Sequence, residues 1–364
     1  MNLPASFITY TRALIGDEEY EQLATALQQE PPVSIRLNRQ KAENEKCQSV
    51  DNQFRTEEND LRSLVVENAN VPWSSEGYYL DSRLTFTFDP LFHAGIYYVQ
   101  EASSMFVEQV LRRYVAGPVV MLDLCAAPGG KSTHARSVLP EGSLLVANEV
   151  IRNRSQVLAE NLTKWGDSGV VVTNNDPSDF SELPSFFDVI LTDVPCSGEG
   201  MFRKDPVAVS EWSPENVEIC WQRQRRIIAD IWPSLKPGGI LIYSTCTYNI
   251  KEDEENVNWI RDEFGAEALA LDVPEAWKIT GNLLLGKSET LGKSEGSDVY
   301  KGSDVSKGSD TSNVSETSEA EMPVYHFFPH KTRGEGFFLA ALRKPESELG
   351  SELERQDMYS VAFS

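Results

Sequence analysis

Two cysteines stand in short turns that directly follow runs of apolar residues, a pattern typical of buried strands. Cys196 lies in the segment DVPCSG at 193–198, after the apolar residues 189–191. Cys246 lies in the segment TCT at 245–247, after the apolar residues 240–243. A cysteine thiolate is a strong nucleophile, so thiols at strand ends indicate covalent chemistry on a bound substrate. Thiol chemistry alone does not decide which of the two cysteines attacks.

A loop of small residues upstream has the composition of a cofactor-binding turn. Residues 123–132 read DLCAAPGGKS and follow the apolar residues 119–122. The phosphate-binding pattern needs a glycine where Cys125 stands, and the pattern Gly-x-Gly-x-x-Gly is absent as well. What is left is a strand, an acidic residue, a tight turn and a helix N-terminus. An uncharged or zwitterionic ligand can lie against the backbone N–H groups of such a turn.

Acidic residues follow three consecutive predicted strands. Asp123 opens the small-residue loop, Glu149 closes the next strand, and Asp176 follows the third. A carboxylate at the position of Glu149 can accept hydrogen bonds from both hydroxyls of a ribose. Asp176 can accept a hydrogen bond from an adenine amino group. A single such residue more often caps a helix, but three at successive strand ends indicate a nucleoside ligand.

Strands that alternate with helices must position these motifs. The predicted strands are 119–123, 144–148, 169–172, 188–192 and 239–244, with helical stretches between them. Continuous apolar strands of this kind predict an α/β fold, in which helices cover both faces of a mostly parallel sheet. Segments 324–328 and 336–342 are expected to complete the sheet as a strand pair. Right-handed connections bring the carboxyl ends of parallel strands, and hence the motifs, to one edge.

The residues before this sheet predict a smaller α+β domain, at 1–108. We expect helices within 6–29, a strand at 33–37, short strands near 78–80 and 84–86, and a helix from 103 to 114. Residues 42–60 are polar and predict a surface connection or a weak helix. The catalytic domain is then expected at 109–345. It contains a polar low-complexity insert at 286–321, in which Gly-Ser-Asp recurs at 296, 302 and 308. We expect this insert to be disordered. Residues 346–364 are expected to form an acidic tail.

Composition narrows the class of protein. The 364 residues suffice for two domains, and no run approaches the roughly 18 apolar residues of a membrane helix. The first residues carry no secretory signal pattern, and five widely spaced cysteines do not predict a disulfide framework, so we expect a reducing cytoplasm. The four histidines are not spaced as metal ligands, and no metal is expected. A net charge of −23 argues weakly against a nucleic-acid partner, because such partners usually require a basic surface.

The motifs nevertheless resemble those of the RNA (cytosine-5)-methyltransferases of the Nop2/Sun family. The resemblance spans about 34–344 without the insert, and it is strongest with the bacterial branch that modifies small-subunit ribosomal RNA. The residues that carry it are SIRLN at 34–38, YVQEASSM at 98–105, DVPCSGEGMFRKDP at 193–206 and LKPGGILIYSTCTYN at 235–249. It implies a class I, Rossmann-like methyltransferase fold, S-adenosylmethionine as the cofactor, and methylation of carbon 5 of a cytosine in RNA, with 16S rRNA as the expected substrate.

The resemblance also implies roles for individual residues. Cys246 would attack carbon 6 of the cytosine, Cys196 would assist release of the methylated product, and Asp193 would hydrogen-bond to or protonate the ring nitrogen. In DNA cytosine methyltransferases the Pro-Cys thiol attacks, so Cys196 is the rival nucleophile. The cofactor contacts are expected at Cys125, Ala126, Ala127, Pro128, Gly129, Gly130, Lys131, Glu149, Asp176 and Asp193.

RNA is the expected partner, and the domain at 1–108 is expected to contact it. Arg203 and Lys204 are candidates for phosphate contacts, and Phe202 and Trp212 are candidates for stacking on a displaced base. Core packing is at least as good an interpretation for Trp212. Three other functions stay open at this point: a ribosome-assembly or RNA-binding factor with little turnover, a methyltransferase acting on tRNA, and a DNA methyltransferase.

Overall fold

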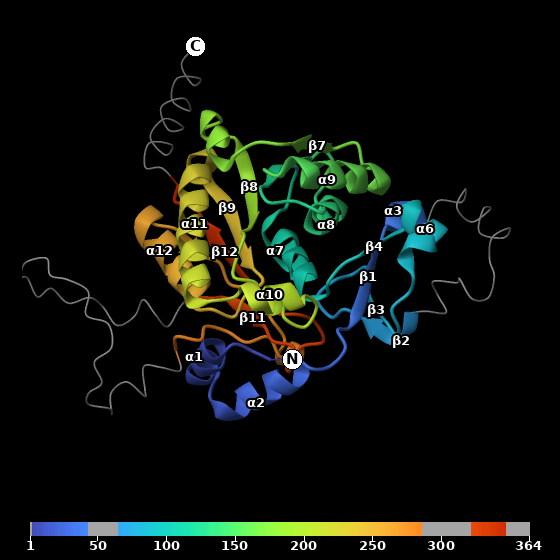
Figure 1. Ribbon diagram of the computed structural model, residues 1–364. Coiled ribbons are helices and arrows are strands. Elements are labelled where there is room, and N and C mark those ends of the chain that lie inside the picture. The colour runs from blue at the N-terminus through green and yellow to red at the C-terminus, as the bar shows by residue number, and fades with distance from the viewer. Residues whose placement is uncertain (1, 43–64, 286–321, 347–364) are drawn as a thin grey trace, which may run out of the picture.

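The computed structural model describes residues 2–42, 65–285 and 322–346 (Figure 1). The predicted low-complexity insert at 286–321 lies outside the described residues, as do nearly all of the polar connection at 42–60 and of the acidic tail at 346–364. The helices are α1 (Ala5–Ile15), α2 (Asp17–Ala26), α3 (Arg39–Ala42), α6 (Pro90–His93), α7 (Val107–Tyr114), α8 (Gly130–Val138), α9 (Arg152–Trp165), α10 (Pro206–Glu211), α11 (Pro214–Ile231) and α12 (Glu254–Phe264). The strands are β1 (Val33–Leu37), β2 (Val65–Asn70), β3 (Gly77–Leu80), β4 (Tyr97–Val99), β5 (Val120–Asp123), β6 (Leu144–Asn148), β7 (Val170–Thr173), β8 (Phe187–Asp193), β9 (Leu235–Thr245), β10 (Glu267–Ala268), β11 (Tyr325–Phe327) and β12 (Phe337–Arg343).

The larger sheet has the order β10-β12-β9-β8-β5-β6-β7, with β11 paired to β12. Strands β5 to β9 run parallel, and β12 runs antiparallel to β9. The five predicted parallel strands and the closing strand pair are therefore confirmed, as is the Rossmann-like α/β class. The chain runs outward from β5 through β6 to β7 and then returns to β8 on the other side of β5. Open α/β sheets bind ligands at such a switch point, outside the carboxyl ends of the strands.

Alternation of side chains along each strand explains why helices cover both faces. Met121 of β5 packs into a core that includes Val110 of α7 and Ala135 of α8. Its neighbour Leu122 points the other way, into a core that includes Ile227 of α11 and Val257 of α12. In Figure 1, α11 and α12 lie on one side of the sheet and α7, α8 and α9 on the other. The central strands of this sheet are thus covered by an apolar layer on each face, which explains their continuous apolar runs.

The smaller sheet has the order β2-β3-β1-β4, and all its pairs are antiparallel. The predicted strands at 33–37 and 78–80 are confirmed, but the one predicted at 84–86 is wrong. Phe86 instead begins a short 3-10 turn, Phe86–Phe88, and its ring packs against those of Phe92 and Tyr97. The edge strand β4 was not predicted, because three residues are too few to show an alternating pattern.

The N-terminal helices pack on loops of the larger sheet and lie apart from the smaller sheet (Figure 1). The ring of Phe7 in α1 lies 5.1 Å from that of Phe202 and 5.6 Å from that of Trp212. Phe202 and Trp212 are both buried in this cluster. Their predicted role in stacking on a displaced base is therefore wrong, and the core interpretation of Trp212 is confirmed.

The junction between the two predicted domains lies within one apolar core. Phe106, Val107 and Val110 all pack in the cluster that covers one face of the larger sheet. The predicted boundary at residue 108 stays a prediction. Among the described residues, no helix combines the length and the apolar character that crossing a membrane requires.

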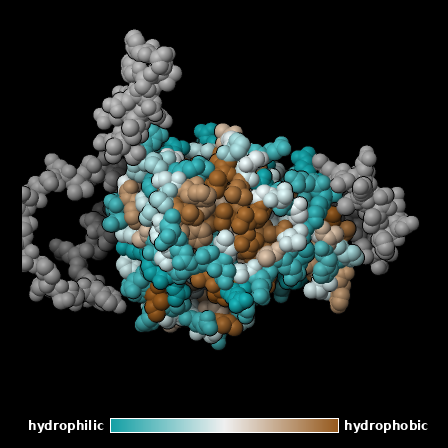
Figure 2. Space-filling model, turned by 90° about the horizontal axis from the view of Figure 1, so that it is seen from above, coloured by the Kyte–Doolittle hydropathy of each residue, from teal (hydrophilic) through white to brown (hydrophobic). Residues whose placement is uncertain are grey.

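The outer surface also has an apolar region. Figure 2 shows apolar residues gathered in the middle of the face seen from above, with hydrophilic residues around them. Leu183 and Phe186, just before β8, are among the large apolar side chains that stay exposed.

Candidate active site

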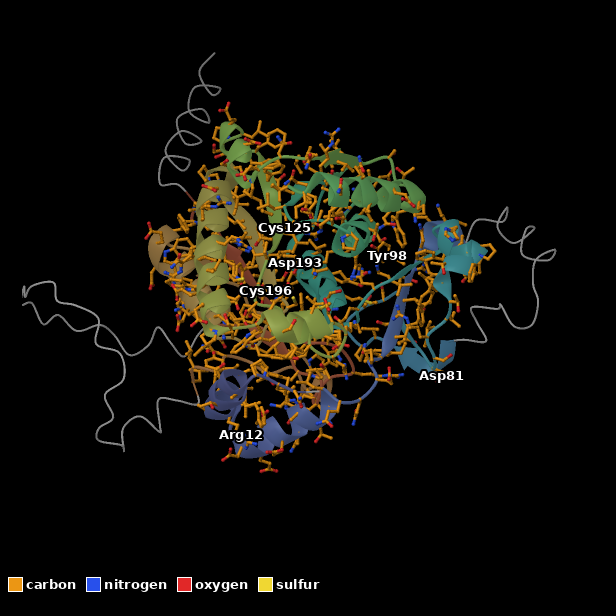
Figure 3. The ribbon with its side chains drawn as sticks, in the orientation of Figure 1. Arg12, Asp81, Tyr98, Cys125, Asp193 and Cys196 are labelled. Carbon is orange, nitrogen blue, oxygen red and sulfur yellow. The ribbon has the colours of Figure 1, made fainter. Side chains whose placement is uncertain are left out.

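The carboxyl ends of the parallel strands bring the predicted site residues to one edge. Asp123 pairs with Ala147 of β6 and with Leu191 of β8, so these strands end at the same level. Asp193 pairs with Ser244 of β9, directly before the turn that holds the second cysteine. Figure 3 shows Cys125, Asp193 and Cys196 in a row through the middle of the molecule.

The two cysteines of the opening motifs face each other. The Sγ atoms of Cys196 and Cys246 lie 3.1 Å apart, although the residues are 50 positions apart in sequence. The backbone N–H of Cys246 also donates to the Sγ of Cys196, at 3.3 Å. Both residues are partly exposed, so a substrate can reach them. The hydrogen bond to Cys246 and burial raise the pKa of Cys196 well above its usual value, so this thiol keeps its proton at neutral pH.

An ion pair stands beside the two thiols. The ammonium group of Lys131, at the start of α8, donates to the Oδ2 of Asp193 at 2.8 Å. The other carboxylate oxygen of Asp193 accepts from the hydroxyl of Ser244 at 2.9 Å. Burial lowers the pKa of Lys131, but the Asp193 carboxylate raises it by more, so the pKa lies above its usual value. The sequence placed Lys131 only in the cofactor loop and did not reveal this pairing.

A buried carboxylate joins the two cysteine turns. Glu199 accepts from the indole N–H of Trp212 at 3.0 Å and from the side-chain amide of Asn249 at 3.2 Å, both through Oε1. Its Oε2 accepts from the backbone N–H of Tyr248 at 3.1 Å. The side chains of Ser197 and Thr247, one residue after each cysteine, also hydrogen-bond, at 3.1 Å. The geometry of the thiol pair therefore depends on Glu199, which sequence reasoning did not single out although it lies in the motif at 193–206.

The N-terminal helix α1 reaches the same turn. The hydroxyl of Tyr10 accepts from the backbone N–H of Ile250 at 3.0 Å and donates to the Oδ1 of Asn249 at 3.3 Å. Asn249 in turn donates to Glu199. A chain of hydrogen bonds therefore runs from α1 to the turn of Cys246. No motif signals this contact, because Tyr10 lies about 240 positions before its partners.

A second acidic group lies beneath these turns. The Oε2 of Glu252 accepts from the backbone N–H of Ser197 at 3.0 Å and from the side-chain amide of Gln224 at 2.7 Å. Burial raises the pKa of Glu252 to about 7.

His326 lies close to two further acidic residues that its sequence spacing did not reveal. Candidate ligand atoms of Asp253, Glu254 and His326 lie within 4.8 Å of one another, and all three residues are buried. The Nε2 of His326 and the Oε1 of Glu254 are joined by a hydrogen bond of 2.8 Å, which links β11 to α12. This pairing gives the buried histidine and carboxylate a structural role.

The cofactor loop is held by hydrogen bonds to its backbone carbonyls. The carbonyl of Pro128 accepts from the hydroxyl of Tyr98 at 3.1 Å and from the amide of Asn161 at 2.7 Å. Gly129 caps α8 with a φ of 110°, a left-handed conformation that favours glycine. Burial raises the pKa of Cys125 far above its usual range, so its thiol is inert and its backbone shapes the loop.

The acidic residues at the strand ends fit a nucleoside cofactor with a cationic group. Asp123 accepts from the hydroxyl of Ser132 at 2.6 Å through Oδ2, whereas its buried Oδ1 has no partner among the described residues. Burial raises the pKa of Asp123 to about 7, and a bound ammonium donor would stabilise its charged form. Glu149 directly follows β6 and accepts from the N–H of Ile151 at 3.0 Å. Asp176 caps the short helical turn after β7 and is partly exposed.

Two candidate phosphate contacts lie against an acidic residue of the chain itself. The guanidinium of Arg203 lies 3.1 Å from the carboxylate of Glu335, and the side chain is only 5% exposed. Lys204 lies 3.7 Å from the same carboxylate and is more exposed. The predicted phosphate contact at Arg203 is wrong, because its charge is already neutralised inside the protein.

Comparison with known families matches both parts of the chain. The protein-family model described as 16S rRNA methyltransferase RsmB/F matches residues 117–343, which is more than half of the chain. The model described as the N-terminal domain of 16S rRNA methyltransferase RsmF matches residues 3–102. The family resemblance inferred from the motifs is therefore confirmed.

Curated relatives are longer than this chain. Ribosomal RNA small subunit methyltransferase F of Pectobacterium atrosepticum is 35% identical over 286 residues, which cover 76% of this chain and 51% of that protein. The protein of the same name from Serratia proteamaculans is 32% identical over 354 residues, covering 95% of this chain and 64% of that protein. The chain thus spans about half to two thirds of the length of these relatives.

Solved structures share the fold. A methyltransferase homologue from Pyrococcus horikoshii has a TM-score of 0.65 and 24% identity, with 92% of each chain covered. NSun6 from the same organism, solved with SFG, has a TM-score of 0.68 and 20% identity, covering 94% of this chain and 99% of that one. At these identities the likeness establishes the methyltransferase fold.

Proposed function

This chain belongs to the 16S rRNA methyltransferase RsmB/F family, and from that premise we propose that it methylates carbon 5 of a cytosine in RNA. The observation that carries the proposal is the pair of thiols 3.1 Å apart, at the strand edge that also holds the cofactor loop. One thiol that adds to the base and one that helps to release it are what this reaction needs. A protein that only binds RNA has no use for two facing thiols.

S-adenosylmethionine is the proposed cofactor, and when bound it supplies the electrophilic methyl group. Its nucleoside and amino-acid parts would be held by the loop at 125–131 together with Glu149, Asp176 and Asp193. The unpartnered oxygen of Asp123 adds an acceptor for an ammonium group. The sequence analysis counted Asp123 among the three acidic residues that indicate a nucleoside ligand, but it did not name Asp123 as an individual cofactor contact.

Cys246 is the proposed nucleophile. Cys196 holds its proton, so its S–H can donate a hydrogen bond to the sulfur of Cys246. The Cys246 sulfur, once deprotonated, forms a bond to carbon 6 of the cytosine, and the displaced ring electrons make carbon 5 nucleophilic. The Lys131–Asp193 pair holds a proton beside the site, and transfer of that proton to the ring nitrogen offsets the charge that develops.

Release of the product reverses the addition. Once carbon 5 carries the methyl group, a base removes its proton, and the electrons of that bond expel the Cys246 sulfur from carbon 6. Cys196 is the proposed assistant in this step because its sulfur lies against that of Cys246.

The proposed substrate is small-subunit ribosomal RNA, free or in a particle, with the domain at 1–108 contacting it. This assignment follows the names of the family and of the curated relatives. We place the protein in the reducing cytoplasm, which keeps Cys196 and Cys246 as free thiols.

The test uses labelled S-adenosylmethionine with small-subunit RNA or particles that lack the modification. We expect 5-methylcytosine from the wild type, none from Cys246→Ala, and a trapped protein–RNA adduct from Cys196→Ala. Cys220→Ala is the matched control, because it removes a buried thiol of α11 that belongs to neither cysteine turn. If Cys246→Ala formed the adduct instead, the roles of the two cysteines would be exchanged.

Other substrates are distinguished in the same assay. Transfer to tRNA but not to ribosomal RNA would replace the proposed substrate while keeping the reaction, and transfer to DNA would make the chain a DNA methyltransferase. Binding of cofactor and RNA without any transfer would support the ribosome-assembly factor instead.

A further inference from the structure

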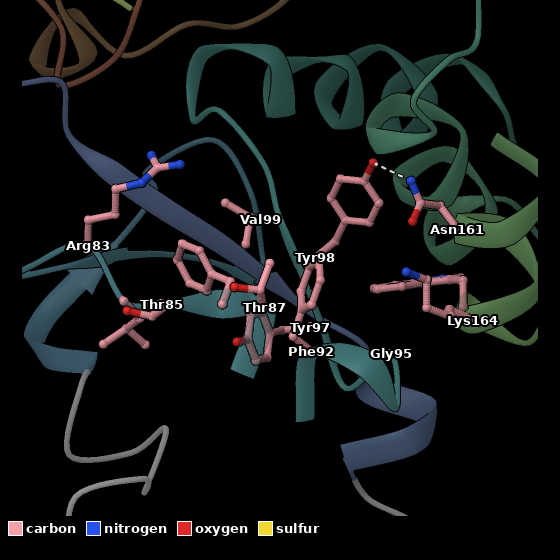
Figure 4. Close-up of a pocket in the computed structure, with 13 residues that line it drawn as sticks. Arg83, Thr85, Thr87, Phe92, Gly95, Tyr97, Tyr98, Val99, Asn161 and Lys164 are labelled. Carbon is pink, nitrogen blue, oxygen red and sulfur yellow. Dashed lines mark hydrogen bonds between the residues drawn. The ribbon is translucent and has the colours of Figure 1, made fainter. Parts of the chain in front are cut away.

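A hollow of about 570 Å³ lies between the smaller sheet and α9 (Figure 4). Arg83 lies at one side of it and Lys164 at the other, with aromatic side chains between them. The rings belong to Phe86, Phe92, Tyr97 and Tyr98. Pockets for small ligands have volumes of about 300–1,000 Å³, so the hollow has room for a nucleotide.

The lining differs in charge from the rest of the chain. The chain has 56 acidic and 33 basic residues, yet the residues that line the hollow include two basic residues and no acidic one. Arg83 is exposed. Lys164 lies 5.3 Å above the ring of Phe92 and pairs with the exposed Glu160 at 3.1 Å. Basic side chains that alternate with aromatic faces are the pattern with which proteins bind single-stranded nucleic acid.

One wall of the hollow is shared with the cofactor loop. Tyr98 and Asn161 line the hollow, and both donate to the carbonyl of Pro128. A side chain added at Gly130 would lie 3.4 Å from the ring of Tyr98, so the ring packs closely on the start of α8. The hollow and the catalytic edge are therefore adjacent to the same loop.

We propose that this hollow binds an unpaired base of the RNA substrate, near the target cytosine, with the base among the aromatic side chains and its phosphate on Arg83. The inference rests on the proposed function, because the proposed RNA substrate supplies both the base and the phosphate. A target base that must leave its stack requires firm contacts to neighbouring nucleotides. This site supplies one such contact without a basic surface over the whole protein, which agrees with the net charge of −23.

Two variants test the phosphate and the base contact separately. Arg83→Glu reverses the charge at the rim, and Thr85→Trp fills the hollow from an exposed lining position. Arg113→Glu is the matched control, because Arg113 is an exposed residue in the last turn of α7, before the amino end of β5. The probe is a fluorescein-labelled single-stranded RNA of about ten nucleotides, read by anisotropy. Binding of S-adenosylmethionine is measured on each variant in parallel.

We expect Arg83→Glu and Thr85→Trp each to weaken RNA binding about tenfold, with cofactor binding unchanged. Arg83→Glu should also reduce the slope of log K against log salt by about 0.7, the value for one phosphate contact in a single strand. Arg113→Glu should match the wild type. If Thr85→Trp does not fold, Thr87→Trp on the same rim takes its place.

Equal RNA affinity in the wild type and both variants would overturn the inference. A loss with Arg83→Glu alone would also overturn the base pocket, because a rim charge would then suffice. These results differ from a failure of the proposed function, in which the wild type transfers no methyl group to any RNA.

Discussion

Replacement of Glu199 by glutamine should loosen both cysteine turns at once. The carboxylate of Glu199 is fully buried and accepts from Trp212, Asn249 and Tyr248. Both oxygens accept from donors, whereas burial raises the pKa of Glu199 above its usual value. In Glu199→Gln one acceptor becomes an N–H₂ group, which cannot accept from the backbone N–H of Tyr248.

The magnitude follows from these three contacts. A buried donor left without a partner costs about 1–3 kcal/mol, and the two hydrogen bonds that stay are made by an amide oxygen in place of a carboxylate. We expect Glu199→Gln to lower the free energy of unfolding by about 2–4 kcal/mol. Misplacement of the thiols should lower kcat for methyl transfer roughly ten- to a hundredfold. The affinity for S-adenosylmethionine should stay unchanged, because the cofactor loop does not contact Glu199.

The assay combines urea unfolding with methyl transfer to small-subunit RNA. Glu218→Gln is the matched control: it removes an exposed carboxylate on α11 that pairs with Lys251, and it should change the free energy of unfolding by less than about 1 kcal/mol. A second measurement combines Glu199→Gln with Tyr10→Phe. These two residues share Asn249, so their effects should not be additive, with a coupling of about 0.5–3 kcal/mol.

The reasoning would be refuted by a Glu199→Gln protein as stable and active as the Glu218→Gln control. Strictly additive effects of Glu199→Gln and Tyr10→Phe would refute the hydrogen-bond chain from α1 in particular.

Three further predictions concern proton transfer, pH and the cofactor loop. Asp193→Asn removes the carboxylate paired with Lys131 and should lower the rate of methyl transfer by about 10²–10⁴-fold, measured in single-turnover kinetics at a saturating concentration of S-adenosylmethionine. Burial raises the pKa of Glu252 from 4.5 to about 7, so Glu252 keeps its proton to a higher pH in the folded protein than in the unfolded protein. The free energy of unfolding of the wild type, relative to that of Glu252→Gln, should therefore fall by about 3 kcal/mol between pH 4.5 and 7. A difference between the two proteins that does not change with pH in urea titrations would contradict this. Gly129→Ala strains a φ of 110° and should weaken S-adenosylmethionine binding about tenfold by calorimetry, whereas an unchanged affinity would show that the loop tolerates a side chain.

The order of apolar and polar residues along the sequence was sufficient to predict much of the fold. The five parallel strands of the larger sheet were predicted because a strand buried on both faces needs a continuous apolar run. Cys196, Cys246 and the small-residue loop were recognised because each stands directly after such a run. Parallel strands end at a common edge, so the sequence also predicted that these motifs meet.

Contacts between distant side chains were decided only by the tertiary structure. Lys131 meets Asp193 and Tyr10 meets Asn249 because packing of α8 and α1 places them there, and no spacing in the sequence encodes those distances. Arg203 was expected at the surface, but Glu335, 132 residues later, neutralises it inside the protein. An isolated sequence records which residues are charged or aromatic. Whether such a residue faces solvent or a partner depends on elements that pack against it from elsewhere in the chain.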